Sequence, residues 1–161
     1  MIKDLYKNKE AKKWRENHGS LECDQDLGER VYTSRLIGSN PDLVMHGGGN
    51  TSCKSTKKDI FGNSIDILCV KGSGWDLEFI EPEGFAELKL DSILELEQLD
   101  SLSDNDMIML QKQSLVNSNS PNPSVETLLH GFIPHKFVDH THASPFLAIA
   151  NLADIKKINE E

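Results

Sequence analysis

The chain has 161 residues, of which 37% are hydrophobic and 27% are charged, and its formal net charge is −9. This length suits one domain with a single core over residues 1–161, and the negative charge disfavours nucleic acid or an anionic membrane as a partner. No apolar run is long enough to cross a bilayer, and the charged N-terminus lacks the apolar core of a signal peptide. The three cysteines contain no CxxC pair, which is typical of reduced thiols and predicts a cytoplasmic location.

The first half of the chain predicts two helices and a β-hairpin. Residues 3–17 indicate a lysine-rich helix with little apolar face, and apolar spacings near four predict a second helix over 21–37. A short apolar strand is expected over 43–45. Two strands, 51–56 and 64–70, then flank a connection rich in turn-forming residues.

Two glycine-rich loops follow the ends of predicted strands. The first is HGGGN at residues 46–50, and the second is KGSGW at residues 71–75. Loops at the ends of neighbouring strands can lie side by side, so that their backbone N–H groups line one anion pocket. Plain strand-exit turns are the commoner meaning of glycine pairs, and neither loop matches the P-loop pattern.

The second half predicts a strand and a series of helices before the most informative stretch of the chain. A strand is expected over 85–90, and helices over 91–99 and 104–116. A polar, proline-broken loop over 117–123 precedes a helix that Ser124 caps and that carries Glu126. A strand over 137–141 and a helix from Pro145 to about Asn151 follow. Helices alternate with a mainly hairpin-connected sheet, so the fold class is α/β with a mixed or antiparallel sheet.

The stretch 123–143 joins one carboxylate, Glu126, to four histidines that end in His140 and His142. On a strand, residues i and i+2 point to the same face, so the two imidazoles can share a Zn²⁺-type metal ion. Surface histidines on an edge strand are the alternative interpretation. A carboxylate beside a metal suits removal of a proton next to a carbonyl, because a divalent metal stabilises the resulting enediolate.

The two glycine loops and Ser124 supply the remaining candidates. They offer backbone amides, hydroxyl and amide side chains and one ammonium group to a phosphate or sugar oxygen. The side chains in question are Asn50, Ser52, Lys71, Ser73 and Ser124. Each of these residues is ordinary by itself, and their co-occurrence is what predicts a site for a phosphorylated sugar.

Three blocks of the sequence resemble a known family. HGGGNTSCK, VKGSGWDLEFIEPEGF and PSVETLLHGFIPHKFVDHTHA are similar to the signature blocks of the class II aldolase/adducin superfamily. The likeness is greatest to the aldolase domain of bifunctional rhamnulose-1-phosphate aldolase/short-chain alcohol dehydrogenase proteins. It implies a three-layer α/β/α fold with a mainly antiparallel sheet, usually in a homotetramer. It also implies reversible, zinc-dependent cleavage of a ketose 1-phosphate to dihydroxyacetone phosphate and an aldehyde, which is a lyase reaction.

The resemblance also implies roles for individual residues. His140 and His142 correspond to two zinc ligands, and Glu126 corresponds to the catalytic acid/base. The positions that correspond to the family's phosphate-binding residues are Gly49, Asn50, Ser73, Gly74 and Ser124.

The sequence departs from the family pattern at two places. Val125 stands where simpler sugar-phosphate aldolases carry a second serine, and Lys71 is a candidate to compensate for the missing hydroxyl. The family's third histidine ligand lies downstream of the HxH block, so we expect the C-terminal part of the family domain to be absent. In principle His46, His130 or His135 can substitute. The alternative functions are a non-catalytic, adducin-like assembly module and a sugar-phosphate epimerase or dehydratase.

Overall fold

The computed structural model describes residues 3–152. In chain order its elements are α1 (Asn8–Asn17), α2 (Glu22–Gly38), β1 (Asn50–Lys58), β2 (Ser64–Lys71), β3 (Phe85–Lys89), α3 (Leu90–Leu94), α4 (Asp104–Gln113), α5 (Thr127–Phe132), β4 (Phe137–His140) and α6 (Ser144–Ala150). Short 3-10 helices occur at Pro82–Gly84 and Glu95–Gln98. The predicted helices and strands are therefore found near their expected places, apart from the strand expected over 43–45.

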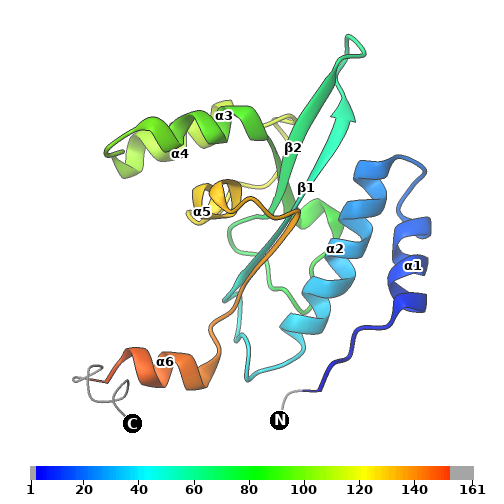
Figure 1. Cartoon of the computed structure of the whole chain (residues 1–161), viewed down its shortest axis with the longest axis vertical. Helices are drawn as coiled ribbons and strands as arrows, with labels where there is room; N and C mark the ends of the chain where they lie inside the picture. The colour runs from blue at the N-terminus through cyan, green and yellow to red at the C-terminus, as the bar shows by residue number, and fades with distance from the viewer. Residues whose placement is uncertain (1–2, 153–161) are drawn as a thin grey trace.

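The four strands form one antiparallel sheet in the order β3-β2-β1-β4. Strand β1 lies inside the sheet, where it pairs with β2 through the predicted hairpin and with β4 along its other side. Helices α1 and α2 cover one face of the sheet, and α3, α4 and α5 lie on the other (Figure 1). The chain therefore has an α/β fold with helices on both sides of an antiparallel sheet, as the sequence predicted.

The alternation of residues along the strands divides the core into two apolar clusters. Towards α2, Cys53 and Cys69 lie opposite each other in the β1–β2 pair, and they pack with Val31 of the helix. Towards α3 and α5, Leu68 and the other inward residues of β2 and β3 pack against both helices. Because successive strand residues face opposite sides, the polar residues of β1 at positions 50, 52 and 54 share the face that carries α5.

The strand expected over residues 43–45 is not formed, and that prediction is wrong. Asn40 O accepts hydrogen bonds from the amides of both Leu43 and Val44, so the chain turns here. The strand position beside β1 is taken by β4, whose His140 pairs with Asn50. Val44 is still buried, which explains why this segment is apolar. The apolar residues that suggested a strand serve to anchor a turn in the core.

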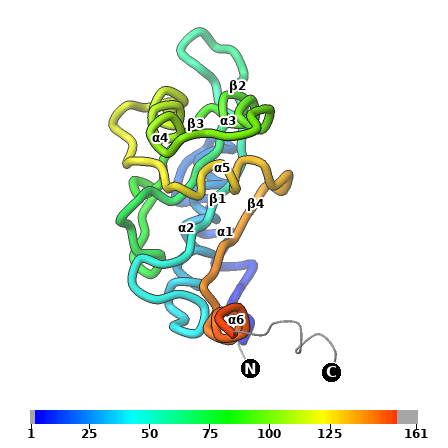
Figure 2. The backbone as a smooth tube through the Cα atoms, turned by 90° about the vertical axis from the view of Figure 1, so that its left-hand side faces the viewer, coloured from blue at the N-terminus to red at the C-terminus, as the bar shows by residue number. Residues whose placement is uncertain are grey.

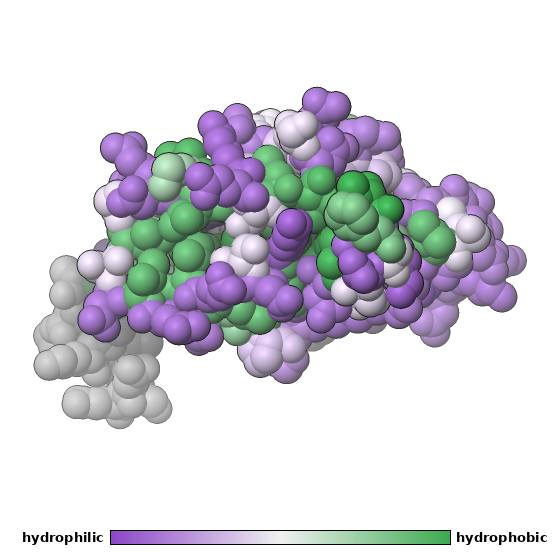
Figure 3. All heavy atoms as spheres, turned by 90° about the horizontal axis from the view of Figure 1, so that it is seen from above, coloured by the Kyte–Doolittle hydropathy of each residue, from purple (hydrophilic) through white to green (hydrophobic). Residues whose placement is uncertain are grey.

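The surface of the helical layers carries exposed apolar side chains. They gather on the side of the molecule that holds α3 and α4 (Figure 3), where Leu94, Leu99, Ile108 and Met109 are exposed. Helix α6 extends away from the sheet (Figure 2) and exposes Phe146. Among residues 3–152, no helix has the length and apolar character that a membrane-spanning segment needs.

Candidate metal and substrate site

Glu126, His130 and His140 converge between α5 and β4. One ligand atom from each of these residues lies within 4.8 Å of the others. Glu126 immediately precedes α5, His130 lies one turn further along that helix, and His140 is the last residue of β4. The chain runs directly from α5 into β4 at the edge of the sheet (Figure 2), so one continuous segment brings all three side chains together.

His130 is the most enclosed of the three residues. Its side chain is 0% exposed, and its Nδ1 lies 2.8 Å from the Ser52 hydroxyl of strand β1. Its Nε2 is buried and has no hydrogen-bond partner. Burial lowers the pKa of His130 to about 4, because the charged form loses its hydration. At neutral pH the ring is therefore uncharged and able to offer a lone pair.

Glu126 and His140 are half-buried and lie against each other. Glu126 Oε1 is 3.0 Å from His140 Nδ1, a nitrogen that is buried without an aligned hydrogen-bond partner. The backbone N–H of Glu126 donates to the Ser124 hydroxyl at 3.2 Å. The turn that precedes α5 thus positions the carboxylate. The N-cap of α5 is Glu126 itself, so the prediction that Ser124 caps a helix carrying Glu126 is wrong.

His142 lies next to this group but is not a member of it. Strand β4 ends at His140, so His142 stands in the following loop and not on the expected strand. The two imidazole centroids are nevertheless 4.9 Å apart. His142 donates its backbone N–H to Leu43 O at 2.8 Å, and its Nδ1 lies 3.2 Å from the place where a Cβ of Gly48 would stand. The first glycine loop therefore borders His142.

The two glycine loops contact each other through Lys71. Its buried ammonium donates to Gly47 O at 3.3 Å, and Gly47 N–H donates to Asp76 Oδ2 at 3.1 Å. Burial lowers the pKa of Lys71, and the negative charges of Glu126 and Asp76 oppose that shift. The ammonium of Lys71, a residue of the second loop, therefore binds the first loop and lies in the electrostatic field of the Glu126 carboxylate.

Several backbone amides of these loops already have partners. Gly48 N–H donates to Met45 O, Gly72 N–H to Gly84 O and Ser73 N–H to Asn122 O. These three amides are therefore not available to an anion, because a local turn uses the first and distant carbonyl groups accept from the other two.

The other predicted residues take different positions around the site. Gly49 is buried with a φ of +71°, and a Cβ there would meet His140 O at 2.8 Å. Asn50 is buried and its Oδ1 has no hydrogen-bond partner. Ser52 is buried beneath His130, so it is not exposed in the way that a phosphate contact requires. Ser73 and Gly74, in contrast, are exposed.

Sequence reasoning gave too little weight to His130 and did not single out Asp76. Glu126 and His130 are four residues apart, a spacing that places two side chains on one side of a helix. That spacing was the available signal for His130. No comparable local pattern marks Asp76, since its contact with Gly47 depends on the fold.

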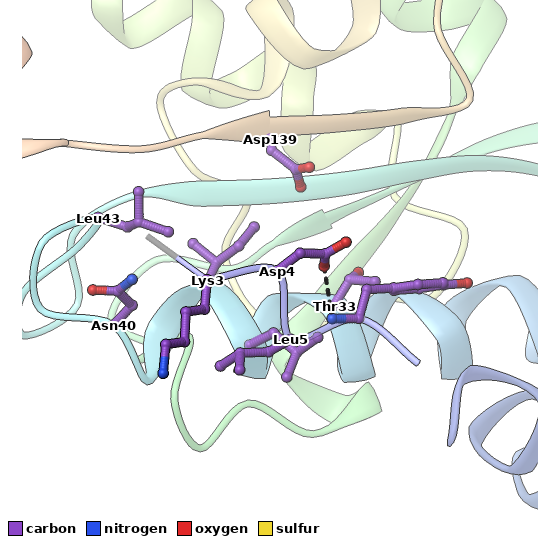
Figure 4. Close-up of a pocket in the computed structure, with 10 residues that line it drawn as sticks. Lys3, Asp4, Leu5, Thr33, Asn40, Leu43 and Asp139 are labelled. Atoms are coloured by element: carbon purple, nitrogen blue, oxygen red, sulfur yellow. Dashed lines mark hydrogen bonds between the residues drawn. The ribbon is translucent and has the colours of Figure 1, made fainter. Parts of the chain in front are cut away.

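A hollow of about 220 Å³ lies on the opposite face of the sheet (Figure 4). It is lined by the N-terminal segment, α2 and Asp139, and the labelled side chains include Lys3, Asp4 and Thr33. Nearby, Asp139 Oδ1 lies 2.7 Å from Nη1 of Arg30, which is 1% exposed. The convergent group of histidines and Glu126 is on the other face, so this hollow belongs to a different part of the molecule.

The residues of the site fit a divalent metal by their chemistry. Imidazole nitrogens and a carboxylate oxygen are the usual ligands of Zn²⁺. Buried polar atoms normally have hydrogen-bond partners, yet Nε2 of His130 and Nδ1 of His140 have none. Ring nitrogens without hydrogen-bond partners, gathered with a carboxylate, are donors that suit a divalent metal.

Fold and site together define an α/β domain with a histidine–carboxylate cluster at a sheet edge, bordered by two glycine loops. The sequence profile of the "Class II Aldolase and Adducin N-terminal domain" matches residues 28–161, and the chain belongs to this family. This confirms the family assignment made from the three sequence blocks.

Two relatives show how far this similarity extends. The chain is 44% identical over 133 residues to "Uncharacterized oxidoreductase YuxG" of Bacillus subtilis (strain 168), a match that covers 83% of this chain and 19% of that protein. A solved structure, described as the N-terminal class II aldolase domain of a conserved protein from Thermoplasma acidophilum, is 47% identical with a TM-score of 0.77. That match covers 84% of this chain and 63% of the other. The chain thus spans less than two thirds of either relative.

Proposed function

We propose that this chain is a zinc-dependent, class II aldolase-like domain. Its reaction is the reversible cleavage of a ketose 1-phosphate, such as rhamnulose 1-phosphate, to dihydroxyacetone phosphate and an aldehyde. The observation that carries this proposal is the contact between Glu126 and His140, with a buried neutral His130 beside them. A carboxylate next to unpaired imidazoles suits proton transfer beside a bound metal.

Glu126 is the acid/base of this proposal. In the direction of cleavage its carboxylate takes the proton of the substrate hydroxyl as the carbon–carbon bond breaks, and it later returns a proton to the carbon of dihydroxyacetone phosphate. The side chain is half-buried, so it is reached by substrate and still partly shielded from water. His140 and His142 would hold the metal, which would supply Lewis-acid stabilisation of negative charge on the substrate oxygens.

Lys71 and nearby polar side chains are proposed to hold the phosphate. Lys71 is buried among the two glycine loops and near Glu126, so its ammonium offsets the negative field of a chain with net charge −9. The Ser73 and Ser124 hydroxyls and the Asn50 amide are the other candidates, with Gly49 and Gly74 shaping the loops. We leave Ser52 out of the phosphate contacts, because its hydroxyl is committed to His130.

The test compares two substitutions of glutamate. We expect Glu126→Gln to abolish release of dihydroxyacetone phosphate from rhamnulose 1-phosphate and related ketose 1-phosphates while metal content stays unchanged. Glu97→Gln changes an exposed glutamate and is expected to retain full activity. Retention of activity by Glu126→Gln would show that Glu126 is not the base. A wild-type protein that binds zinc but cleaves none of these substrates would contradict the proposed reaction.

A further inference from the structure

We infer that Asp76 is a positioning residue for the substrate phosphate, because it links the first glycine loop to the second and fixes the position of both. This inference rests on the proposed function, since these are the loops proposed to hold the phosphate. Asp76 directly follows the second loop, KGSGW. It is not itself one of the proposed phosphate contacts, so its effect on substrate binding passes through the first loop.

The carboxylate of Asp76 joins its own turn to the first glycine loop. Its Oδ1 accepts the backbone N–H of Glu78 at 2.9 Å, which is a local turn contact. Its Oδ2 accepts the backbone N–H of Gly47 at 3.1 Å, from 29 residues earlier in the chain. The next residue, Leu77, is buried, and its Cδ1 lies 3.3 Å from the place where a Cβ of Gly49 would stand. This short segment therefore contacts the first loop at two positions.

Lys71 holds the same glycine through its other backbone group. The buried ammonium donates to Gly47 O at 3.3 Å, so Asp76 binds the N–H of Gly47 and Lys71 binds its carbonyl. Hydrogen bonds of this kind, in which one partner is charged, are stronger than those between neutral groups. Asp76 also favours the charged form of Lys71, since its negative charge opposes the lowering of the Lys71 pKa by burial. Loss of the Asp76 charge therefore affects both contacts with Gly47.

The backbone of the first loop is strained and depends on such contacts. His46 has a φ of +35°, and it is the only residue other than glycine with a positive φ among residues 3–152. Gly47 and Gly49 have φ values of +75° and +71°. A non-glycine residue in this region persists only where its surroundings fix it. His46 and Gly47 are exposed, so the two charged contacts with Gly47 supply this fixation in place of core packing.

The first loop borders the residues that the proposed reaction uses. Gly48 lies next to His142, whose Nδ1 is 3.2 Å from the place where a Cβ of Gly48 would stand. Gly49 directly precedes Asn50, which pairs with His140 of β4. A shift of the loop would therefore move Gly49, a proposed phosphate-binding position, relative to the proposed metal ligands. Misplacement of a substrate by about 1 Å can lower the rate by about 100-fold.

A purely local role is the competing explanation, in which Asp76 only stabilises its own turn. Two substitutions separate the roles. Asp76→Asn has one acceptor oxygen and no charge, so it can keep the contact with Glu78 N–H but not the contact with Gly47 N–H as well. Asp76→Ser also keeps a turn-forming side chain, and its shorter side chain does not reach Gly47. The two explanations differ in what happens to the first loop and to phosphate binding.

The first experiment measures amide hydrogen exchange over residues 46–49 of the whole protein, and it needs no catalysis. We expect Asp76→Asn and Asp76→Ser each to speed exchange there by about 10-fold or more, because a hydrogen bond to a charged group is lost. Asp59→Asn is the matched control, since Asp59 accepts Phe61 N–H at 2.8 Å in a similar turn of the β1–β2 hairpin. Exchange equal to that of wild type in both Asp76 variants would refute the link between the loops.

The second experiment measures cleavage of rhamnulose 1-phosphate and its inhibition by inorganic phosphate. We expect both Asp76 variants to raise KM and the phosphate inhibition constant by about 10–100-fold, with a much smaller change in kcat. The urea midpoint should stay near that of wild type, and Asp59→Asn should retain wild-type constants. An unchanged or lower KM, or a loss confined to the urea midpoint, would overturn the role of Asp76 alone. A wild-type protein that neither binds phosphate nor cleaves a ketose 1-phosphate would instead contradict the proposed function.

Discussion

Replacement of Gly49 by alanine is expected to destabilise the fold strongly and to disturb the site at the same time. Gly49 is the residue of the first glycine loop that directly precedes β1, and its φ is +71°. A Cβ built on it would lie 2.5 Å from Val44 Cγ1 and 2.8 Å from His140 O. The second contact is with backbone of the strand that carries the histidine, so it is not relieved by rotating a side chain.

The magnitude follows from two separate costs. An L-residue in the left-handed region costs roughly 1–2 kcal/mol relative to glycine. Forcing an extra carbon into a packed site costs about 1–3 kcal/mol. We therefore expect Gly49→Ala to lower the free energy of unfolding by about 2–5 kcal/mol, which is a large share of the stability of a typical domain.

Gly62 supplies a control that separates these costs. It has a φ of +86° in the turn of the β1–β2 hairpin, and no atom lies within 4 Å of its would-be Cβ. Gly62→Ala carries the conformational cost alone, about 1–2 kcal/mol. Urea denaturation followed by circular dichroism measures both variants against wild type. Equal losses for the two variants would refute the argument from crowding against His140 O.

Three further outcomes follow from buried charges and hydrogen bonds. In metal-free protein, the His130 pKa of about 4 lies below its unfolded value near 6.5. The free energy of unfolding should therefore fall by about 3 kcal/mol as the pH drops from above 6.5 to 4. Denaturation of wild type and His130→Gln over this pH range checks this, and an unchanged pH slope in the variant would contradict it. Lys54→Met removes the ammonium that binds one carbonyl group of α5 and two of the segment after it, and it should cost about 1–3 kcal/mol. Lys58→Met at an exposed position of the same strand should cost only about 0.5 kcal/mol or less. Asp139→Asn leaves the buried guanidinium of Arg30 without its counter-ion. It should lower the free energy of unfolding by about 2–4 kcal/mol and therefore lower the thermal midpoint. A midpoint equal to that of wild type would exclude the ion pair as a stabilising contact.

The regular elements of this fold were accessible from sequence because local signals agree with the tertiary structure. Turn-forming residues over 57–63 mark the hairpin, and Ser103 caps α4 through a bond from Asp106 N–H at 3.2 Å. The error at residues 43–45 arose because an apolar run is compatible with both a strand and a buried turn. The choice between them was made by β4, which occupies the position beside β1. The sequence around residue 43 does not indicate which segment pairs with β1.

The site was predictable in its parts but not in its arrangement. The HxH pair and Glu126 were recognisable from spacing and resemblance, yet β4 ends at His140 and His142 lies beyond it. The availability of loop amides was also invisible from sequence, because Gly84 O and Asn122 O, which accept the Gly72 and Ser73 amides, come from distant segments. Pairing partners of this kind depend on long-range contacts, and a pattern of glycines does not specify them.

The central strand β1 explains why the site forms where it does. Its residues 50, 52 and 54 lie on the face that carries α5, and each is polar, although most residues of an interior strand face are apolar. Ser52 holds the ring of His130 and Lys54 holds its carbonyl, while Asn50 pairs directly with His140. One strand therefore fixes both His130 and His140, and it does so with side chains and pairing that would otherwise be costly in a core. Polar residues at three successive inward positions of a central strand are best explained by the need to place these histidines, so substitutions there should alter metal affinity as well as stability.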